Sequence, residues 1–359
     1  MNPTVVAAII AAAVSFLTLI VTVIAQLVGY RSNSRDLDRT LAEQRTRTWN
    51  ERFATAAEQV GSDKPAVRLA GVYAMAGLAD DWEANRQTCV DVLCAYLRMP
   101  YEPDPGPSEN EEKRLAFEGS LEVRHTVIRV IAAHLKKDAA VSWQSLNLDF
   151  TGVVFDGGDF SGAQFSGKVS FSGAVFSGGQ VNFDGAVFSG EVSFSRCVFS
   201  VFSEVSFPEA VFSGTVSFSR AVFNGGSVKF SGAEFSGGRV SFSYAVFTEG
   251  QVSFRSVDFT GGEVSFRGAR FTGGEVSFRG ARFTGGEVSF HGVEFTGGEL
   301  DFDSTEFTGT EVSFYGAEFS GGTVDFSAAR DWSFPPRFPW ADTPPSGVEL
   351  PRLKDQPKS

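Results

Sequence analysis

The feature that most constrains the fold is a repeat over residues 223–326, where phenylalanine recurs at alternating spacings of five and seven. Two residues before almost every phenylalanine stands a smaller apolar residue, as Val264 precedes Phe266 and Ala269 precedes Phe271. Residues i and i−2 point to the same side of an extended chain, so each unit turns one small and one large apolar group inward. The unit is therefore a pentapeptide, (A/V)-x-F-x-G, with two residues inserted after every second copy.

The same phenylalanine positions continue backward to Phe150, with inserts of other lengths. The spacing is six from Phe165 to Phe171 and eight from Phe199 to Phe207. We expect these rings to form the core of the repeat region, and we name seven from its central coils as representative core residues. They are Phe254, Phe259, Phe266, Phe271, Phe278, Phe283 and Phe290.

A pentapeptide sustained in this way resembles the pentapeptide-repeat family, over residues 148–326. The resemblance implies a right-handed quadrilateral β-helix with four pentapeptides, one per face, in each coil. The two inserts lengthen the expected coil from 20 to about 24 residues, with a bulge at two opposite corners. The 31 phenylalanine centres then give about 7.75 coils. At about 4.8 Å per strand step, the column is roughly 37 Å long.

The N-terminal stretch predicts a membrane anchor. Residues from Thr4 to Val28 are apolar, uncharged and numerous enough to cross a bilayer as one helix. No basic segment precedes them, which favours an uncleaved anchor over a signal peptide. Arginines follow, so we expect a single-pass protein of a bacterial cell membrane with its N-terminus outside and its C-terminal domains in the cytoplasm. These are Arg31, Arg35, Arg39, Arg45 and Arg47.

One face of this helix suggests self-association in the membrane. It carries Ala11, Ser15, Thr18, Thr22 and Gln26, and small or hydroxyl side chains allow close packing of helices in lipid. The alternative is that a lone span tolerates small residues.

The whole sequence predicts an α+β multidomain chain. Its expected parts are an anchor (1–30), a juxtamembrane helix (31–61), a helical domain (62–147), the β-helix (148–331), and an aromatic cap with a disordered tail (332–359). In the helical domain we expect one helix after Ser62 with Pro65 in its first turn, and others over residues 84–97 and 121–135. Its segments PAVRLAGVYAMAGLA and LEVRHTVIRVIAAHL resemble helical hairpins of HEAT and armadillo repeats. A proline-rich acidic loop over residues 99–114 separates them.

Both ends of a β-helix expose unpaired strand edges, which must be covered to prevent aggregation. We expect Val141, Trp143, Leu146 and Leu148 to cover the first coil. A second set of aromatics is expected over the last coil, namely Trp332, Phe334, Phe338 and Trp340.

The sequence predicts neither an enzyme nor a cofactor or metal site. The histidines, His125, His134 and His291, share no metal-binding spacing. Cys89 and Cys94 are expected in the core of a helix, and Cys197 takes an inward place in the repeat. Three cysteines offer no disulfide framework, which suits a reducing compartment. We find no nucleophile elbow, phosphate loop or paired acid motif.

Charged residues on the outside of the repeat form the candidate interaction surface. Residues 148–326 hold 21 acidic and 10 basic residues, so most of the net charge of −12 lies there. Glutamates recur every twelve residues, and those 24 apart should stack in two ladders, with Arg267, Arg270, Arg279 and Arg282 offsetting part of the repulsion. The ladders are Glu263, Glu287 and Glu311 in one, and Glu275 and Glu299 in the other. The alternative is a solvated face that only keeps the rod soluble.

These features suggest a membrane-tethered, non-enzymatic scaffold that presents a helical module and a rod to cytoplasmic protein partners. The alternative comes from the resemblance, because some pentapeptide-repeat proteins protect DNA gyrase with an acidic rod that resembles duplex DNA. The anchor and the helical domain do not belong to that pattern. We do not expect nucleic acid itself as a partner.

Overall fold

The computed structural model describes residues 3–101, 106, 110–341 and 343–352, apart from the side chains of residues 8, 13 and 27–39. The chain forms two compact units, Met1–Thr55 and Ala56–Ser359. Residues 353–359 of the tail expected to be disordered lie outside the described part.

A single helix, α1 (Pro3–Val60), makes up the first unit and runs into the second. The anchor and the juxtamembrane helix expected from the sequence are therefore one continuous element. Within α1, Pro3 at its first turn is the one proline and Gly29 the one glycine, so no proline interrupts the helix. Its segment Pro3–Gln26 has a mean hydropathy of 2.7 and is long and apolar enough to cross a membrane. Ser15 and Thr22 donate their hydroxyls to the carbonyls of Ala11 and Thr18 in the same helix, which satisfies these groups locally.

Three further helices form the helical domain. They are α2 (Pro65–Asp81), α3 (Arg86–Arg98) and α4 (Glu111–His134), with a short 3₁₀ turn, η1 (Glu83–Asn85), before α3. Helix α4 therefore begins at Glu111, ten residues before the start of the helix that the sequence predicted over residues 121–135. Asn110 accepts a hydrogen bond from the Lys113 amide at 2.9 Å, and Glu111 and Glu112 favour the positive end of the helix dipole.

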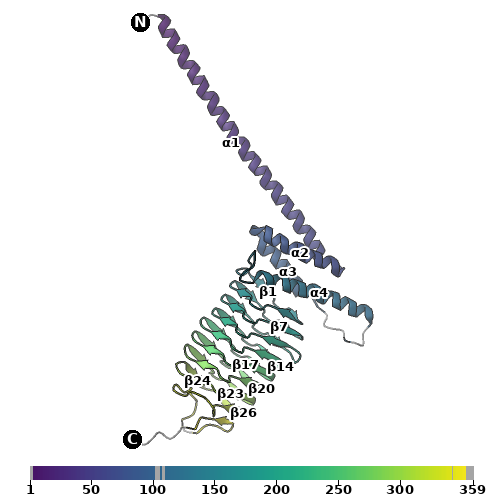
Figure 1. The fold of residues 1–359 in the computed structure, drawn as a ribbon, viewed down its shortest axis with the longest axis vertical. Coiled ribbons are helices and arrows are strands. Elements are labelled where there is room, and N and C mark those ends of the chain that lie inside the picture. The colour runs from purple at the N-terminus through teal and green to yellow at the C-terminus, as the bar shows by residue number, and fades with distance from the viewer. Residues whose placement is uncertain (1–2, 102–105, 107–109, 342, 353–359) are drawn as a thin grey trace. The chain divides into compact units, whose positions relative to one another are not determined.

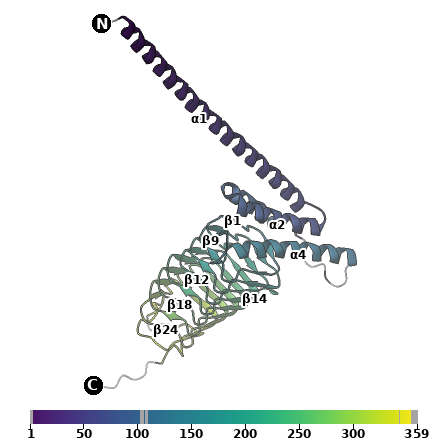
Figure 2. The same ribbon diagram turned by 45° about the horizontal axis from the view of Figure 1, so that its top comes forward.

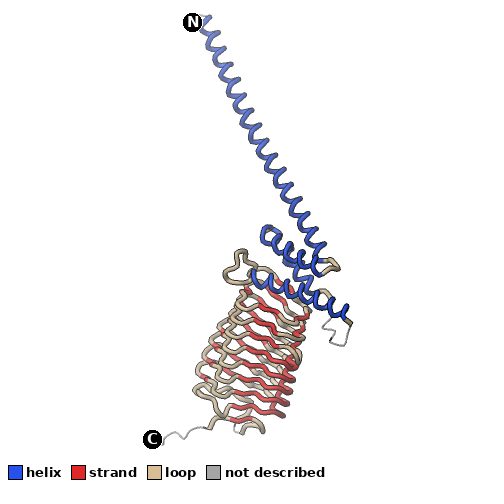
Figure 3. The backbone as a smooth tube through the Cα atoms, turned by 45° about the vertical axis from the view of Figure 1, so that its right-hand side comes forward, coloured by secondary structure: helices blue, strands red, loops and turns tan. Residues whose placement is uncertain are grey.

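The rest of the second unit is a parallel β-solenoid of about eight turns, as the fold class predicted. Figure 1 and Figure 2 show its coils stacked from β1 to β24, and Figure 3 shows the strands as parallel bands. The strands form three sheets. The first holds β1 (Leu148–Asp149), β5 (Lys168–Ser170), β9 (Glu191–Ser193), β13 (Thr215–Ser217), β16 (Arg239–Ser241), β19 (Glu263–Ser265), β22 (Glu287–Ser289) and β25 (Glu311–Ser313).

The second sheet contains the longest strands. It holds β2 (Val154–Phe155), β3 (Gly158–Asp159), β6 (Val175–Phe176), β7 (Gln180–Asn182), β10 (Val198–Phe199), β11 (Glu204–Ser206), β14 (Val222–Lys229), β17 (Val246–Ser253), β20 (Arg270–Ser277), β23 (Glu294–Asp301), β26 (Glu318–Asp325) and β27 (Val348–Glu349). The third holds β4 (Gln164–Phe165), β8 (Val187–Phe188), β12 (Val211–Phe212), β15 (Glu234–Phe235), β18 (Asp258–Phe259), β21 (Arg282–Phe283) and β24 (Glu306–Phe307).

Three sheets arise in place of the expected four faces because two faces merge. From β14 onward, one eight-residue strand runs through the insert corner between them, and its ladder shifts register at Phe223 and Asn224. The other insert corner, at residues 260–262, stays outside any strand and separates β18 from β19. A bulge was expected at both insert corners. The corner within the eight-residue strands does form a strand bulge, whereas the corner at residues 260–262 forms a turn.

Four columns of phenylalanine fill the interior. Within a column the rings stack nearly parallel, as Phe278 does on Phe254 at 4.8 Å and on Phe302 at 5.0 Å between centroids. Neighbouring columns meet edge to face, as Phe266 and Phe278 do at 5.9 Å and 78°. The seven representative rings are all buried, at 3% exposure or less. The stacking distance matches the separation of paired strands, so backbone pairing and ring stacking support each other.

The helical domain covers the first coil through α3 and α4, and Arg98 of α3 pairs with Asp149 of β1 at 3.1 Å. Arg124 donates to the carbonyl oxygen of Leu97 at 2.9 Å and to that of Val154, in β2, at 2.8 Å. The Gln164 amide, at the start of β4, donates to the Leu135 carbonyl at 2.8 Å. Trp143, expected over this coil, is fully buried, stacks on His134 at 3.9 Å and donates to Asp80, and the adjacent Gln144 carbonyl accepts hydrogen bonds from Ser166 and Gly167 of the coil.

The cap at the other end continues the phenylalanine columns. Phe338 stacks on Phe314 at 5.5 Å, while Trp332 and Trp340 meet Phe307 and Phe319 edge to face. Phe334, the fourth expected cap residue, is 60% exposed. Beyond these rings, β27 pairs with β26, so part of the segment assigned to a tail extends the second sheet.

The junction between α4 and the first coil predicts a dependence on pH. Burial raises the pKa of the Asp156 carboxyl, but hydrogen bonds from His125 and Tyr101 outweigh it, so this pKa lies below its ordinary 3.8. A carboxyl of this kind stabilises the fold above its unfolded pKa and loses that contribution as pH falls through the folded value. We expect Asp156→Asn to cost about 1–2 kcal/mol at pH 7 and to flatten the loss of stability below about pH 4.

Urea unfolding of the full chain in detergent, repeated across pH, measures this effect. Glu118→Gln, a change elsewhere on α4, serves as the control. If Asp156→Asn lost stability below about pH 4 as steeply as the unmodified protein does, Asp156 would not be the source of this pH dependence.

Candidate interaction surface

The glutamate ladders lie in register on two sheets. Glu263 pairs with Glu287, and Glu287 with Glu311, along the first sheet. Glu275 pairs with Glu299 on the second sheet. Residues 24 apart therefore stack one strand step from each other, which brings like charges close and requires compensation.

That compensation comes from residues other than the expected arginines. Arg239 contacts Glu263 at 2.9 Å at one end of the first ladder, and Arg337 contacts Glu311 at 2.9 Å at the other. Within the described part of the chain, the central Glu287 has no cationic partner at ion-pair distance. The first ladder is thus an acidic segment closed at each end by an arginine.

The expected compensating arginines pair elsewhere because they belong to other columns. Arg270 contacts Glu294 at 3.9 Å, Arg279 contacts Asp303 at 3.1 Å, and Arg282 contacts Asp258. Arg267 forms no ion pair with any described residue. Parallel in-register stacking joins residues about 24 positions apart, so an arginine three or four positions from a glutamate lies on another row.

The third sheet carries a column of alternating charge. Arg282 lies between Asp258 and Glu306 in the register, and Arg330 contacts Glu306 at 3.2 Å. The pKa of the Arg282 guanidinium is raised by the hydrogen bond to Asp258 and by the charge on that carboxylate. This column is close to neutral along its length, so the acidity of the rod is concentrated on the other two sheets.

The earlier coils of the first sheet carry a row of half-buried hydroxyl groups beside charged residues such as Lys168 and Glu191. Serine side chains bond to each other from coil to coil, for example Ser195 to Ser217 at 2.9 Å. The chain of hydroxyls runs through Ser172, Ser193, Ser195, Ser217, Ser219, Ser241, Ser243 and Ser265. It ends there because Arg267 occupies the next position of the row.

The earlier coils of the second sheet expose an apolar column, which we call the valine column. Its half-buried members occupy the outward place before each phenylalanine, and Arg270, Glu294 and Glu318 take that place in later coils. The valine column consists of Val154, Val175, Val198, Val222 and Val246. The outward place before each phenylalanine of this sheet therefore changes from valine in the earlier coils to a charged residue in the later ones.

An exposed apolar bulge adjoins the valine column. Val201 and Phe202 lie in the corner between β10 and β11, where they are 51% and 84% exposed. Reasoning from the repeat missed this pair, although the eight-residue spacing from Phe199 to Phe207 marks it. Corner residues beyond the pentapeptide do not face inward, so the additional phenylalanine points outward.

The remaining candidates for chemistry have structural partners. His125 lies 3.3 Å from Asp156, and His134 lies 3.1 Å from Asp80. Burial raises the pKa of the Cys94 thiol to about 12 and also raises that of Cys197, which donates to the Phe171 carbonyl. Across the described residues, no group of three histidine, cysteine or acidic side chains is arranged to hold a metal ion.

Parallel stacking of about eight coils with filled phenylalanine columns defines the repeat region as a β-solenoid. Residues 150–198, 207–257 and 249–298 match the family of pentapeptide repeats (9 copies). The matched residues lie in the repeat region, which is therefore similar to the pentapeptide-repeat family and fits its solenoid fold. Neither the curated proteins nor the solved structures gave a match to the chain.

Proposed function

We propose that this protein is a membrane-tethered, non-enzymatic scaffold that holds protein partners against its solenoid. The apolar bulge carries this proposal, because a phenylalanine that is 84% exposed on a rigid β-surface is an aromatic anchor of the kind that dominates protein interfaces. The valine column beside it adds apolar area, and the adjoining serines offer hydrogen bonds around its margin.

Anchoring in a bacterial cell membrane by residues 4–28 belongs to the same proposal. The apolar helix supports it, and the arginines after Tyr30 favour a cytoplasmic location for the helical domain and the solenoid. The HEAT-like character of the helical domain remains a prediction, as does self-association through the membrane helix. In the proposal, the helical domain is a second surface for partners.

Proximity labelling from the full-length protein in its native membrane tests the scaffold. We expect Val201→Ser combined with Phe202→Ser to remove most labelling of the partners that the unmodified protein labels. Phe334→Ser, at the other exposed phenylalanine of the second unit, should leave labelling unchanged. A double variant with an unaltered set of labelled proteins would contradict the role of the bulge.

The charge pattern gives weaker support to the alternative, in which the rod imitates duplex DNA. DNA carries one negative charge per about 1.7 Å of its axis, whereas a net charge of −11 over roughly 37 Å is about half that density. On the third sheet, ion pairs neutralise Asp258 and Glu306. Loss of supercoiling by DNA gyrase when the full-length protein is added would favour the alternative over the scaffold.

A further inference from the structure

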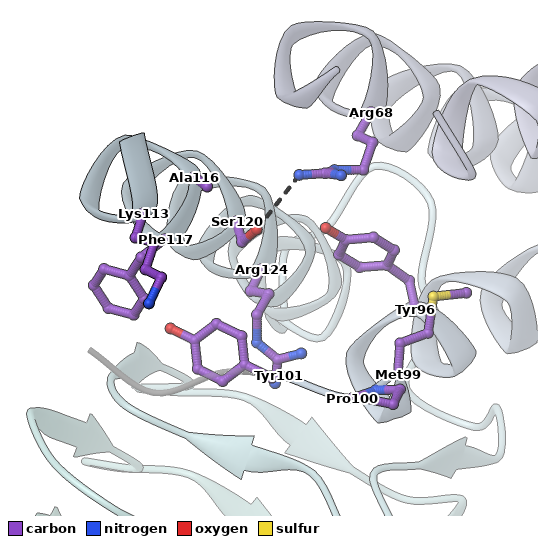
Figure 4. Close-up of a pocket in the computed structure, with 10 residues that line it drawn as sticks. All are labelled: Arg68, Tyr96, Met99, Pro100, Tyr101, Lys113, Ala116, Phe117, Ser120 and Arg124. Carbon is purple, nitrogen blue, oxygen red and sulfur yellow. Dashed lines mark hydrogen bonds between the residues drawn. The ribbon is translucent and has the colours of Figure 1, made fainter. Parts of the chain in front are cut away.

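A cavity in the helical domain has no role in the scaffold. It has a volume of about 400 Å³ and lies between α2, the end of α3 and α4, entirely within the second unit. Figure 4 shows its lining. The residues that matter here are Arg68, Tyr96, Tyr101, Phe117, Ser120 and Arg124.

Two guanidinium groups reach this one cavity. Phe117, Ser120 and Arg124 lie three, four and seven residues apart on α4 and so share one helical face. Arg68 enters from α2, with its Nη2 3.5 Å from the Ser120 hydroxyl. The serine therefore lies next to the Arg68 guanidinium, and Arg124 follows it by one turn of α4.

Neither arginine forms an ion pair with a described residue. Arg124 is 4% exposed and donates only to the Leu97 and Val154 carbonyls, and burial lowers its pKa. Arg68 donates to the Ser62 carbonyl at 3.2 Å, while its Nε is buried without a hydrogen-bond partner. Burial of the Arg124 guanidinium is only partly offset by the charge of the nearby Asp156 carboxylate, and an oxyanion between the two arginines would offset more of that cost.

Aromatic rings form the rest of the wall. The Arg124 guanidinium lies 4.3 Å from the centre of the Tyr101 ring, which fixes its orientation. Tyr96, which is 8% exposed, also lines the cavity (Figure 4). Pockets of this size with apolar walls and a few convergent polar groups are typical sites for small organic ligands.

We propose that this cavity binds a small aromatic phosphate. The phosphate group accepts hydrogen bonds from Arg68, Ser120 and Arg124, and the ring of the ligand packs against Tyr96 and Phe117. Arginine suits this role because its planar fork donates two parallel hydrogen bonds to phosphate oxygens.

Binding of phenyl phosphate to the full-length protein in detergent tests this proposal, with calorimetry for affinity and thermal unfolding for stability. We expect saturable binding, a rise in Tm with ligand concentration, and affinity about tenfold or more weaker in Arg68→Gln. Arg129→Gln, an exposed site on α4, should bind as the unmodified protein does.

Two comparisons sharpen the test. Inorganic phosphate should bind more weakly than phenyl phosphate because it lacks the ring, and benzoate should bind more weakly because it lacks the third oxygen. Arg68 is the decisive site because Arg124 also holds the first coil, and Arg124→Lys serves as a second variant whose folding is checked by its Tm without ligand. Absence of phenyl phosphate binding, or equal binding in Arg68→Gln, would overturn the proposal.

Discussion

Gly286→Ala is expected to destabilise the solenoid by about 3 kcal/mol or more, whereas Gly292→Ala should cost about 1 kcal/mol. Both glycines have positive φ, +79° and +62°. A Cβ on Gly286 would lie 2.4 Å from the carbonyl oxygen of Gly262 in the previous coil, but a Cβ on Gly292 would meet nothing within 4 Å. The two variants therefore share the backbone penalty and differ in the clash.

The clash at Gly286 cannot be relieved locally. Its neighbour is backbone, and Gly262 is in turn close to the Gly238 carbonyl, so a shift would pass to the next coil. Chemical unfolding of the full chain, followed by the circular dichroism of the solenoid, measures both variants. Similar losses for Gly286→Ala and Gly292→Ala would mean that the coils are not packed as closely as described.

Phe278→Ala should cost about 3–5 kcal/mol, because it empties one place in a filled column. The ring is fully buried, stacks on two others and meets Phe266 and Phe290 edge to face. Phe202→Ala is the matched control, since the same residue type is 84% exposed there. It should change stability by less than about 0.5 kcal/mol.

Unfolding of the two phenylalanine variants should also differ in form. Solenoid coils contact mainly their neighbours, so a gap at Phe278 can uncouple the coils on either side and broaden the transition. Equal stability of the two variants would contradict the interior columns. A large loss in Phe202→Ala would contradict the exposed corner.

The core of the solenoid was predictable because its cause is local. Each inward residue follows from the period of the pentapeptide, and a glycine corner keeps its left-handed conformation even where another residue replaces glycine. Arg220 and Tyr244 have φ of +59° at the corner where later coils have Gly268 and Gly292. The fold therefore imposes the corner, and glycine reduces its cost.

The merging of two faces could not be predicted, because identical sequences behave differently. Residues 259–266 and 271–278 both read FTGGEVSF, yet the first is broken between β18 and β19 and the second is the body of β20. The two segments lie at different corners of the coil and pair with strands of different sheets, so the tertiary context decides their hydrogen bonding.

The ion pairs and the cavity could not be predicted from the sequence for a related reason, because both depend on tertiary packing. The partners of Glu263 and Glu311 are 24 and 26 residues away, and the nearer arginines that seemed suitable lie on other columns. Arg68 and Arg124 come from two helices whose packing no periodicity reveals. The outward Phe202 could have been predicted, because the eight-residue spacing from Phe199 to Phe207 departs from the repeat.

Distances between spin labels along the first sheet test the central claim, a parallel column that rises one strand step per coil. One label replaces Lys168 and the second replaces Glu263, Glu287 or Glu311 in turn, four, five and six coils away. The three native cysteines are buried, which favours selective labelling. We predict separations of roughly 19, 24 and 29 Å, an equal increase of about 4.8 Å per coil. Unequal steps, or increases near the 36 Å or so that 24 residues of helix would give, would contradict the solenoid.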